Sequence, residues 1–127
     1  MFKQSPTFSS YSIDDLAAAR SFYGGMLGLE VDERPEGLAV KLGGGGYLFL
    51  YPKPNHQPAS FTVLNFHVPN IEEAVSALRT RGVQFIHHDE PALKTDARGI
   101  HFGERGPRAI AWFEDPAGNI LAVLQPR

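Results

Sequence analysis

Two segments of this chain repeat one pattern, and this repeat limits the possible folds more than any other feature of the sequence. Each segment ends a strand, caps a helix and returns through a glycine into another strand. They read SIDDLAAARSFYGGMLGLEV and HVPNIEEAVSALRTRGVQF. Ile13 matches Val68 at an offset of 55 residues, and Gly28 matches Gly82 at an offset of 54. The repeat predicts two copies of one supersecondary unit.

Both copies carry the signals of an amphipathic helix. In the second copy Asn70 is a good N-cap and Glu73 completes a capping box. In the first copy Asp14 or Asp15 can cap the helix. Apolar residues then recur at helical spacing, and the expected buried stripes are Leu16, Ala19, Phe22 or Tyr23, and Leu27 in the first copy, and Ile71, Ala74, Val75 and Leu78 in the second.

Short strand-like runs follow each helix. They cover residues 29–34, 38–42 and 47–51 in the first copy, and 83–88, 100–102, 108–114 and 119–124 in the second. The expected order is strand, helix and three strands, twice. Segment 53–60 holds two prolines and no apolar periodicity, so it is interpreted as a linker. We therefore expect one domain with module one at about 6–52 and module two at about 61–127.

Composition narrows the possible partners and compartment. The 127 residues have a formal net charge of -2, which gives no basic surface for nucleic acid or anionic membranes. No apolar run approaches the roughly 20 residues that span a bilayer, and the start of the chain lacks a targeting pattern. The absence of cysteine excludes disulfides, thiolate metal sites and cysteine nucleophiles. A cytoplasmic protein without nucleic-acid or membrane partners is expected.

Near the end of the chain, the sequence WFEDPAGNILAVLQ combines a turn with an apolar strand. Proline presets its backbone angle, glycine accepts positive φ, and aspartate or asparagine can bond nearby amides. The segment Asp115-Pro116-Ala117-Gly118-Asn119 is therefore predicted to form a turn that sets the register of the last strand.

Together with the two repeated helices, this segment resembles the vicinal oxygen chelate superfamily, which includes glyoxalase I, extradiol dioxygenases, fosfomycin-resistance enzymes and bleomycin-resistance proteins. The shared pattern is an aspartate-leucine pair, a helix ending in phenylalanine-tyrosine, leucine-glycine-leucine, and a late aspartate-proline-x-glycine-asparagine. The resemblance implies an α+β fold of two paired βαβββ modules whose curled mixed sheets surround a cavity. It also implies a homodimer.

The resemblance also indicates where a metal would bind. Metal-dependent members place histidine, glutamate or glutamine at four positions, one in the first and one in the last strand of each module. The motifs map these positions onto Phe8, Phe49, Val63 and Ala122. Their hydrocarbon side chains offer no donor atom to a divalent ion. We therefore expect neither a metal nor another cofactor at the family's site.

A ligand-binding face follows from the same mapping and from the alternation of side chains along strands. Asn65 and His67 share a face with Val63, and several aromatic residues lie on expected strands, either as plain core or as stacking surfaces. The candidate ligand-binding residues are Phe8, Ser10, Phe49, Tyr51, Val63, Asn65, His67, His101, Trp112 and Ala122.

The histidines and the loop before the last strands allow several interpretations. His67 is the candidate for acid-base catalysis, against a histidine that bonds a core or rim partner. Adjacent strand residues point to opposite faces, so His87 and His88 are not expected to chelate one ion. His56 is expected at the linker surface. A group comprising Arg98, His101, Glu104 and Arg108 either forms a polar mouth for a ligand or belongs to a flexible hairpin.

These observations favour a metal-free small-molecule-binding protein of the glyoxalase/bleomycin-resistance type. Its ligand would be a partly apolar or aromatic metabolite or antibiotic. The alternative is a lyase, isomerase or dioxygenase that uses a relocated metal or His67 as an acid-base group. Asn65, His67, His101 and Glu104 are the residues considered for such a metal set. A third possibility is a structural or regulatory dimer without a ligand.

Overall fold

The computed structural model describes residues 1–127, and its contacts divide the chain into two compact units, Met1–Pro58 and Ala59–Arg127. The first unit contains β1 (Ser9–Ile13), α1 (Leu16–Arg20), η1 (Ser21–Met26), β2 (Val31–Arg34), β3 (Gly37–Lys41) and β4 (Tyr47–Pro52). The second contains β5 (Thr62–His67), α2 (Ile71–Thr80), β6 (Ile100–Phe102), β7 (Ala109–Glu114) and β8 (Ile120–Gln125). The predicted α+β class with two βαβββ modules is confirmed.

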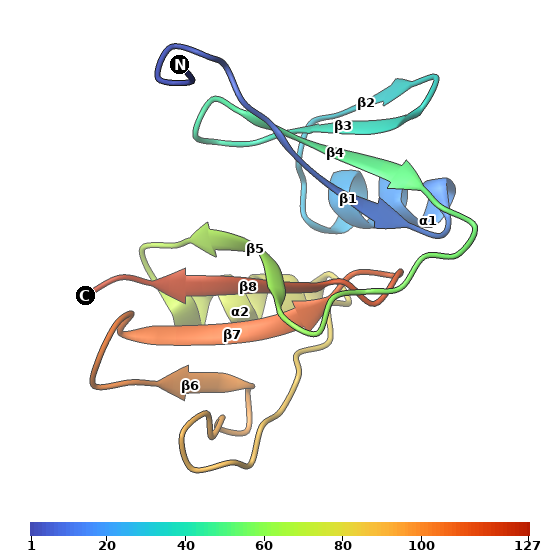
Figure 1. The fold of residues 1–127 in the computed structure, drawn as a ribbon. Helices are drawn as coiled ribbons and strands as arrows, with labels where there is room; N and C mark the ends of the chain where they lie inside the picture. The colour runs from blue at the N-terminus through green and yellow to red at the C-terminus, as the bar shows by residue number, and fades with distance from the viewer. The chain divides into compact units, whose positions relative to one another are not determined.

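Both units use the same sheet topology. The strand orders are β1-β4-β3-β2 and β5-β8-β7-β6. The first and last strands of each unit pair in parallel, while the other neighbours are antiparallel. A parallel pair needs a long crossover, and in each unit the helix and the two middle strands supply it (Figure 1). Each sheet is therefore mixed.

The helix of the first unit changes type along its length. Asp15 is the N-cap, because its Oδ1 accepts a hydrogen bond from the amide of Ala18 at 3.1 Å. From Ser21 to Met26 the helix is a π-helix, and the amide of Leu27 donates to the carbonyl of Phe22 at 2.9 Å. The sequence offered Phe22 or Tyr23 for the buried stripe. Both are buried, since the wider π turn brings two adjacent rings inward.

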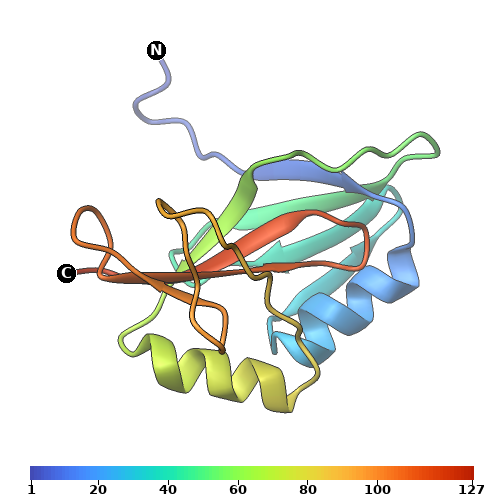
Figure 2. The same cartoon turned by 90° about the horizontal axis from the view of Figure 1, so that it is seen from below.

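In the second unit, α2 covers one face of its sheet (Figure 2). Asn70 caps the helix by accepting from the amide of Glu73 at 3.1 Å. The amide of Ile71, which has no partner within the helix, donates to Oε1 of Gln125 at 2.9 Å. Because Gln125 ends β8, this bond identifies the side of β8 that faces α2. Leu121 and Val123 lie on that side, and both are buried.

The expected strand at residues 83–88 is wrong. This segment makes one isolated bridge, Phe85 with Phe113, and one further backbone bond, from the amide of Ile86 to the carbonyl of Trp112 at 2.8 Å. The remaining outer edge of β7 is occupied by β6. Residues 83–88 and β6 thus share that edge, so neither can extend along all of it.

The predicted turn before β8 is confirmed. Asp115 Oδ1 accepts from the amides of Ala117 at 2.9 Å and Asn119 at 2.8 Å. Gly118 has a φ of 85°, and its amide donates to the carbonyl of Asp115 at 3.0 Å. The following strand pairs with β7 from Ile120 opposite Glu114 onward. The turn therefore fixes which side chains of β8 face α2 and which face away.

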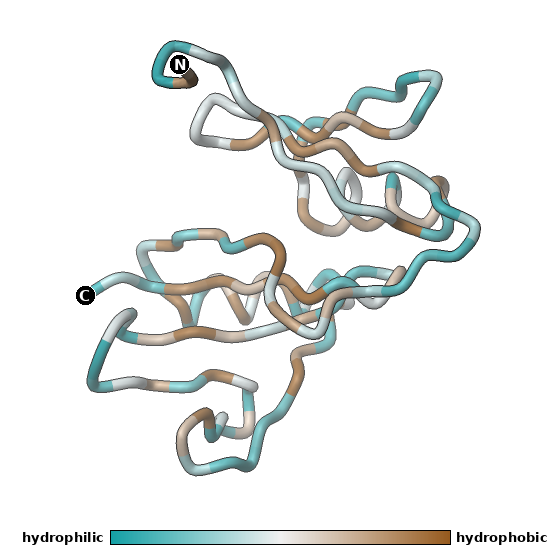
Figure 3. Tube along the Cα trace, viewed as in Figure 1, coloured by the Kyte–Doolittle hydropathy of each residue, from teal (hydrophilic) through white to brown (hydrophobic).

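The core of each unit lies between its helix and its sheet. In the first unit the largest buried side chains include Tyr23, Leu38, Leu48 and Leu50, and in the second they include Phe113, Ile100, Ile71 and Leu121. Figure 3 shows the matching apolar colouring along β4 and β8, with hydrophilic colouring in the connecting segments. Neither helix has the length and apolar character needed to cross a membrane.

Candidate functional site

Each sheet has a second face, opposite its helix, and these faces carry nearly all of the candidate site residues. In the first unit Tyr11 marks the helix side, because its hydroxyl is hydrogen-bonded to that of Tyr23 at 2.7 Å. The alternate residues of β1 and β4 therefore point the other way. We call this surface the N-unit face, and its residues on or beside β1, β3 and β4 are Phe8, Ser10, Ser12, Ala39, Lys41, Tyr47, Phe49 and Tyr51.

Aromatic rings dominate the N-unit face. Phe49 lies between Ser10 of β1 and Ala39 of β3 in the strand register. At one end Phe8 and Tyr47 stack, with ring centroids 4.7 Å apart and planes 8° apart. Their exposed fractions are 56% for Phe8 and 40% for Tyr47. The exposed, stacked rings form a flat apolar surface that suits another planar group, and Lys41 of β3 lies opposite Tyr47 in the register.

At the other end of this face, the structure changes the interpretation of His56. Its Nδ1 lies 2.6 Å from the hydroxyl oxygen of Ser12, and the residue is half-buried. The amide of Lys53 donates to the carbonyl of Ile13 at 2.9 Å, so the segment after β4 is tied to β1. His56 is thus attached to the N-unit face, which corrects the expectation of linker surface.

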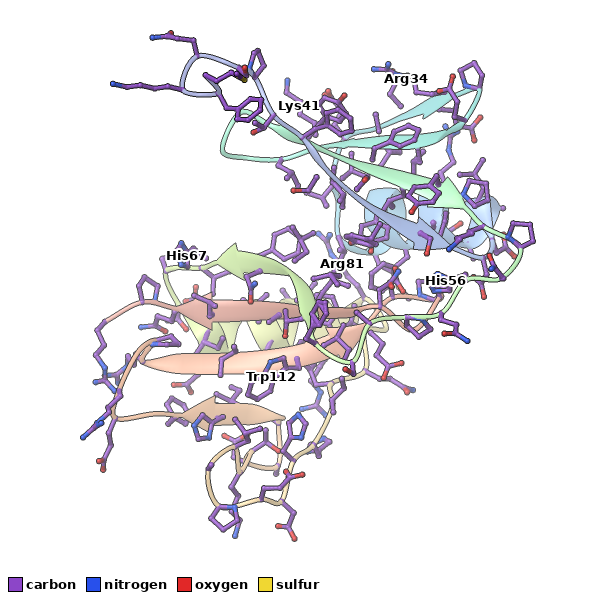
Figure 4. The ribbon with its side chains drawn as sticks, in the orientation of Figure 1. Arg34, Lys41, His56, His67, Arg81 and Trp112 are labelled. Atoms are coloured by element: carbon purple, nitrogen blue, oxygen red, sulfur yellow. The ribbon has the colours of Figure 1, made fainter.

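In the second unit the corresponding surface consists of cross-strand rows on the side of β8 away from α2. One row runs through Asn65, Ala122 and Trp112, and the next through His67, Leu124, Ile110 and His101. We call this surface, together with His88, the C-unit face. Figure 4 shows Trp112 on β7 and His67 at the end of β5.

Two imidazole rings lie beside Trp112, one from the segment of residues 83–88 and one from β6. The ring of His88 meets it edge-on, with centroids 5.0 Å apart and planes 89° apart, and the ring of His101 lies 6.5 Å away at 34°. His87 instead lines a shallow pocket with Arg79 and Arg98 on the α2 side. His87 and His88 therefore point to opposite sides of the sheet.

His88 is the functional candidate that the sequence reasoning missed. The sequence pattern predicts only a strand at residues 83–88 and gives His88 no role, yet His88 is half-buried against Trp112. A signal was present in the alternation, since Phe85 packs on Phe113 on the buried side and His88, three positions on, has the opposite parity. Without the register against β7, nothing in the sequence linked that parity to Trp112.

One candidate, Val63, has a position that alternation alone does not predict. Val63 lies at an irregularity between Thr62 and Leu64 in the pairing with β8, so the residue directly opposite Ala122 is Asn65. Ala122 itself is fully buried. The bulge explains the difference, because one extra residue in a strand displaces the alternation on one side of it.

His67 is exposed and has no hydrogen-bond partner in the structure. It shares a row with His101, but Leu124 and Ile110 stand between them. Three strand spacings separate their backbones by about 14 Å. The two histidines are therefore too far apart to ligate one metal ion, which removes the relocated metal set that contained both.

The family's metal positions do not fit a divalent ion in this chain. Phe8, Phe49 and Ala122 have hydrocarbon side chains, and their cross-strand neighbours Ser10 and Asn65 are poor substitutes for histidine or glutamate. The structure contains no group of three or more histidine, aspartate or glutamate side chains that could hold a metal. The donor chemistry therefore disagrees with the metal-dependent branch of the family.

The polar mouth considered for Arg98 does not form. Its guanidinium donates to Glu72 of α2 at 2.7 Å and to Asp96 at 2.8 Å, so it is held on the α2 side. These hydrogen bonds raise the pKa of Arg98 above its ordinary value, Glu72 contributing most. Burial alone would raise the pKa of Asp96, but bonds from the Ile100 amide and from Arg98 lower it overall. His101 alone of that group faces Trp112.

Comparisons with known proteins agree with this geometry. The family model described as the Glyoxalase/Bleomycin resistance protein/Dioxygenase superfamily matches residues 9–123. A protein from Bacillus anthracis described as a member of the glyoxalase family has a TM-score of 0.71 and 21% identity, covering 100% of this chain and 98% of that one. No curated protein matches the sequence.

Two further solved structures show the range of proteins that share the fold. TnmS3, an antibiotic-binding protein from Streptomyces sp. CB03234, has a TM-score of 0.69 and 21% identity over 100% of this chain and 99% of that one. FosX, a fosfomycin resistance protein from Listeria monocytogenes, has a TM-score of 0.68 and 10% identity over 98% and 94%. The matched family model, which spans both repeated modules, shows that the chain belongs to the Glyoxalase/Bleomycin resistance protein/Dioxygenase superfamily.

Proposed function

We propose that this chain is a metal-free small-molecule-binding protein that holds a planar, partly apolar ligand on the sheet faces opposite its helices. The observation that carries the proposal is the stacked, exposed pair of Phe8 and Tyr47 on the N-unit face. Two exposed rings held parallel are a costly use of apolar surface in water unless a ligand covers them. The same face adds Phe49 and Tyr51.

The C-unit face supports the same function through Trp112 and the residues around it. Trp112 is half-buried beside two imidazoles, and its row continues into Ala122, whose side chain is a single methyl group. An apolar lining with a few placed polar groups is typical of sites for small organic molecules. One neighbour in fold, TnmS3, is described as an antibiotic-binding protein. That likeness makes antibiotics a reasonable first class of ligands to test.

The disagreement with the family's metal site favours binding over metal-assisted catalysis, because the mapped positions offer hydrocarbon in place of donors. The alternative function, cofactor-free acid-base catalysis by His67, has one supporting observation: His67 is exposed on the C-unit face. It lacks a partner that would orient its ring. A catalytic base is normally positioned by a second group, so we rank this function below binding.

Calorimetric titration with a panel of aromatic antibiotics and aromatic metabolites tests the proposal. We expect saturable binding by at least one member. Tyr47→Ala and Trp112→Ala should each weaken that binding about tenfold or more, because an aromatic stacking contact is lost. The matched control is Phe102→Ala, which removes an exposed ring on the α2 side of β6.

The control variant should bind as the parent does. Absence of saturable binding across the panel, or equal losses from Phe102→Ala and the two face variants, would contradict the proposed function. If the parent protein turns over a carbonyl or catechol substrate and His67→Ala does not, that result would favour the catalytic alternative. We propose a cytoplasmic homodimer as the working form, and light scattering at the titration concentrations measures the dimer directly.

A further inference from the structure

We infer that the C-unit face selects ligands that donate a hydrogen bond from a planar ring system, phenols above all. The inference rests on the proposed function and names the chemical class that this face would prefer. It follows from which nitrogen of each imidazole beside Trp112 is already engaged. A neutral imidazole has one N–H donor and one lone-pair acceptor, and the partner of the first nitrogen decides the role of the second.

The hydrogen bonding of His101 determines its tautomer. Its Nδ1 lies 2.9 Å from the backbone carbonyl oxygen of Lys94. A carbonyl oxygen can only accept, so Nδ1 carries the proton. In the neutral ring Nε2 is then a lone-pair acceptor, and it has no partner in the structure. His101 therefore presents an acceptor beside the indole.

His88 is biased in the same direction. Its Nδ1 lies 3.5 Å from a carboxylate oxygen of Glu90. A carboxylate favours the N–H form of the nitrogen that faces it, although this exposed pair is weak. Nε2 of neutral His88 then also becomes an acceptor, again without a partner. Both imidazoles beside Trp112 thus offer acceptors and no donor to a ligand.

The residue that directly follows β6, beside the acceptor of His101, has no side chain. A Cβ atom at Gly103 would lie 3.6 Å from Nε2 of His101, so the glycine places bare backbone next to that nitrogen. On this face Ile110 lies opposite His101, Ala122 lies opposite Trp112 and Leu124 lies opposite Ile110, and all three side chains are hydrocarbon. A ring that stacks here finds apolar contacts on one side and hydrogen-bond acceptors at its edge.

A pair of matched probes tests this inference. The chain has one tryptophan, so a ¹⁵N-labelled sample gives one indole N–H signal, from Trp112. Titration with 2-naphthol and with 2-methoxynaphthalene at pH 8, where an imidazole is ordinarily neutral, compares the same ring with and without the donor. We expect 2-naphthol to bind about tenfold more tightly, since a lost hydrogen bond at a partly desolvated site costs affinity of that order.

Variants assign the preference to these histidines. His101→Phe should reduce the naphthol preference and keep the binding of the methyl ether, and His88→Phe should do so more weakly. His87→Phe is the matched control, because His87 lines the pocket on the α2 side. Gly103→Val adds bulk beside Nε2 and should lower naphthol affinity selectively.

The outcomes separate the two proposals. Equal affinities for the naphthol and its methyl ether would overturn this inference and leave aromatic binding standing. A naphthol preference that survives His101→Phe and His88→Phe together would also overturn it. If neither probe moves the Trp112 signal, binding at this face fails, and the inference fails with it.

Discussion

Asn119 closes the turn before β8 on Asp115 with both its main chain and its side chain. Its amide donates to Oδ1 of Asp115 at 2.8 Å, and its Nδ2 donates to Oδ2 at 3.0 Å. The two residues are the only buried polar or charged residues of the chain. Because the turn sets the register of β8, it also decides that Ala122 and Leu124 lie on the C-unit face.

Asp115→Ala should therefore lower the free energy of unfolding by about 3 kcal/mol, since it leaves several N–H donors without an acceptor. Urea denaturation followed by circular dichroism measures the change. The matched control is Asp89→Ala at an exposed position, for which a change within about 0.5 kcal/mol is expected. A loss at Asp115 no larger than that of the control would show that the turn does not stabilise the unit.

Gly99 lets β6 begin close to the segment of residues 83–88. Its φ is 91°, and an added Cβ would lie 2.8 Å from Cβ of Phe85. Gly99→Ala should cost about 3 kcal/mol, combining left-handed strain of about 1 kcal/mol with a clash against a packed ring. Gly45 has a φ of 100° and open space around it. Gly45→Ala should cost only the strain, and equal thermal shifts for both variants would contradict the close approach.

The pairing of Asp96 with Arg98 predicts a pH dependence of stability. Hydrogen bonds from Ile100 and Arg98 outweigh burial and lower the pKa of Asp96 below its ordinary 3.8. A carboxyl whose folded-state pKa is lowered stabilises the fold above its unfolded pKa, and this contribution disappears as the pH falls through the folded value. The stabilisation from Asp96 should therefore be complete at neutral pH and decline below about pH 4.

Asp96→Asn keeps the shape of the side chain and removes the charge. Because the pair is partly exposed, we expect a loss of only about 1 kcal/mol at pH 7. The difference between the urea midpoints of parent and variant should shrink as the pH falls from 7 to 3. Asp14→Asn, at an exposed position in the first unit, serves as the control. A difference between parent and Asp96→Asn that stays constant from pH 7 to pH 3 would contradict the assigned pairing.

The bond between Gln125 and the first turn of α2 predicts coupling between the last strand and the helix. Gln125→Ala should cost about 1 kcal/mol, similar to the loss of an N-cap in Asn70→Ala. The two side chains satisfy the amides of Ile71 and Glu73 in one helical turn, so the double variant should lose less than the sum of the single losses, because fraying after either change already releases the other bond. Strict additivity in a double-mutant cycle would show that they act independently.

Most of the fold could be predicted from local patterns. Asn70 caps α2 as its sequence position predicted, and Asp15 is the one of the two candidates, Asp14 and Asp15, that caps α1. The strands expected at 108–114 and 119–124 differ from β7 and β8 by at most one residue at each end. The π-helix at Ser21–Met26 could not be predicted, because both Phe22 and Tyr23 suit a buried stripe and only packing against the sheet selects both. The strand expected at residues 83–88 does not form, because a segment can pair as a strand only where a sheet edge is free, and β6 occupies the rest of that edge of β7.

The candidate site was predicted less completely, because the register between strands decides which side chains lie next to each other. Alternation placed Asn65 and His67 on one face with Val63, and the register adds Ala122 and Trp112 to that face, but the bulge at Val63 depends on the pairing with β8. His88 was missed because its contact with Trp112 joins segments that are not neighbours in sequence. Arg98 was considered for the ligand side because its neighbours are polar, whereas its partners Glu72 and Asp96 hold it on the other side.

The central claim is that the sheet faces hold an organic ligand without a metal. Native mass spectrometry of protein purified without chelator, combined with elemental analysis for zinc, nickel, manganese and iron, tests it most directly. The account predicts no stoichiometric metal, together with a chain or dimer mass that increases by one small organic molecule when the ligand is added or retained. One metal ion per chain, lost together with a catalytic activity on dialysis against chelator, would contradict it.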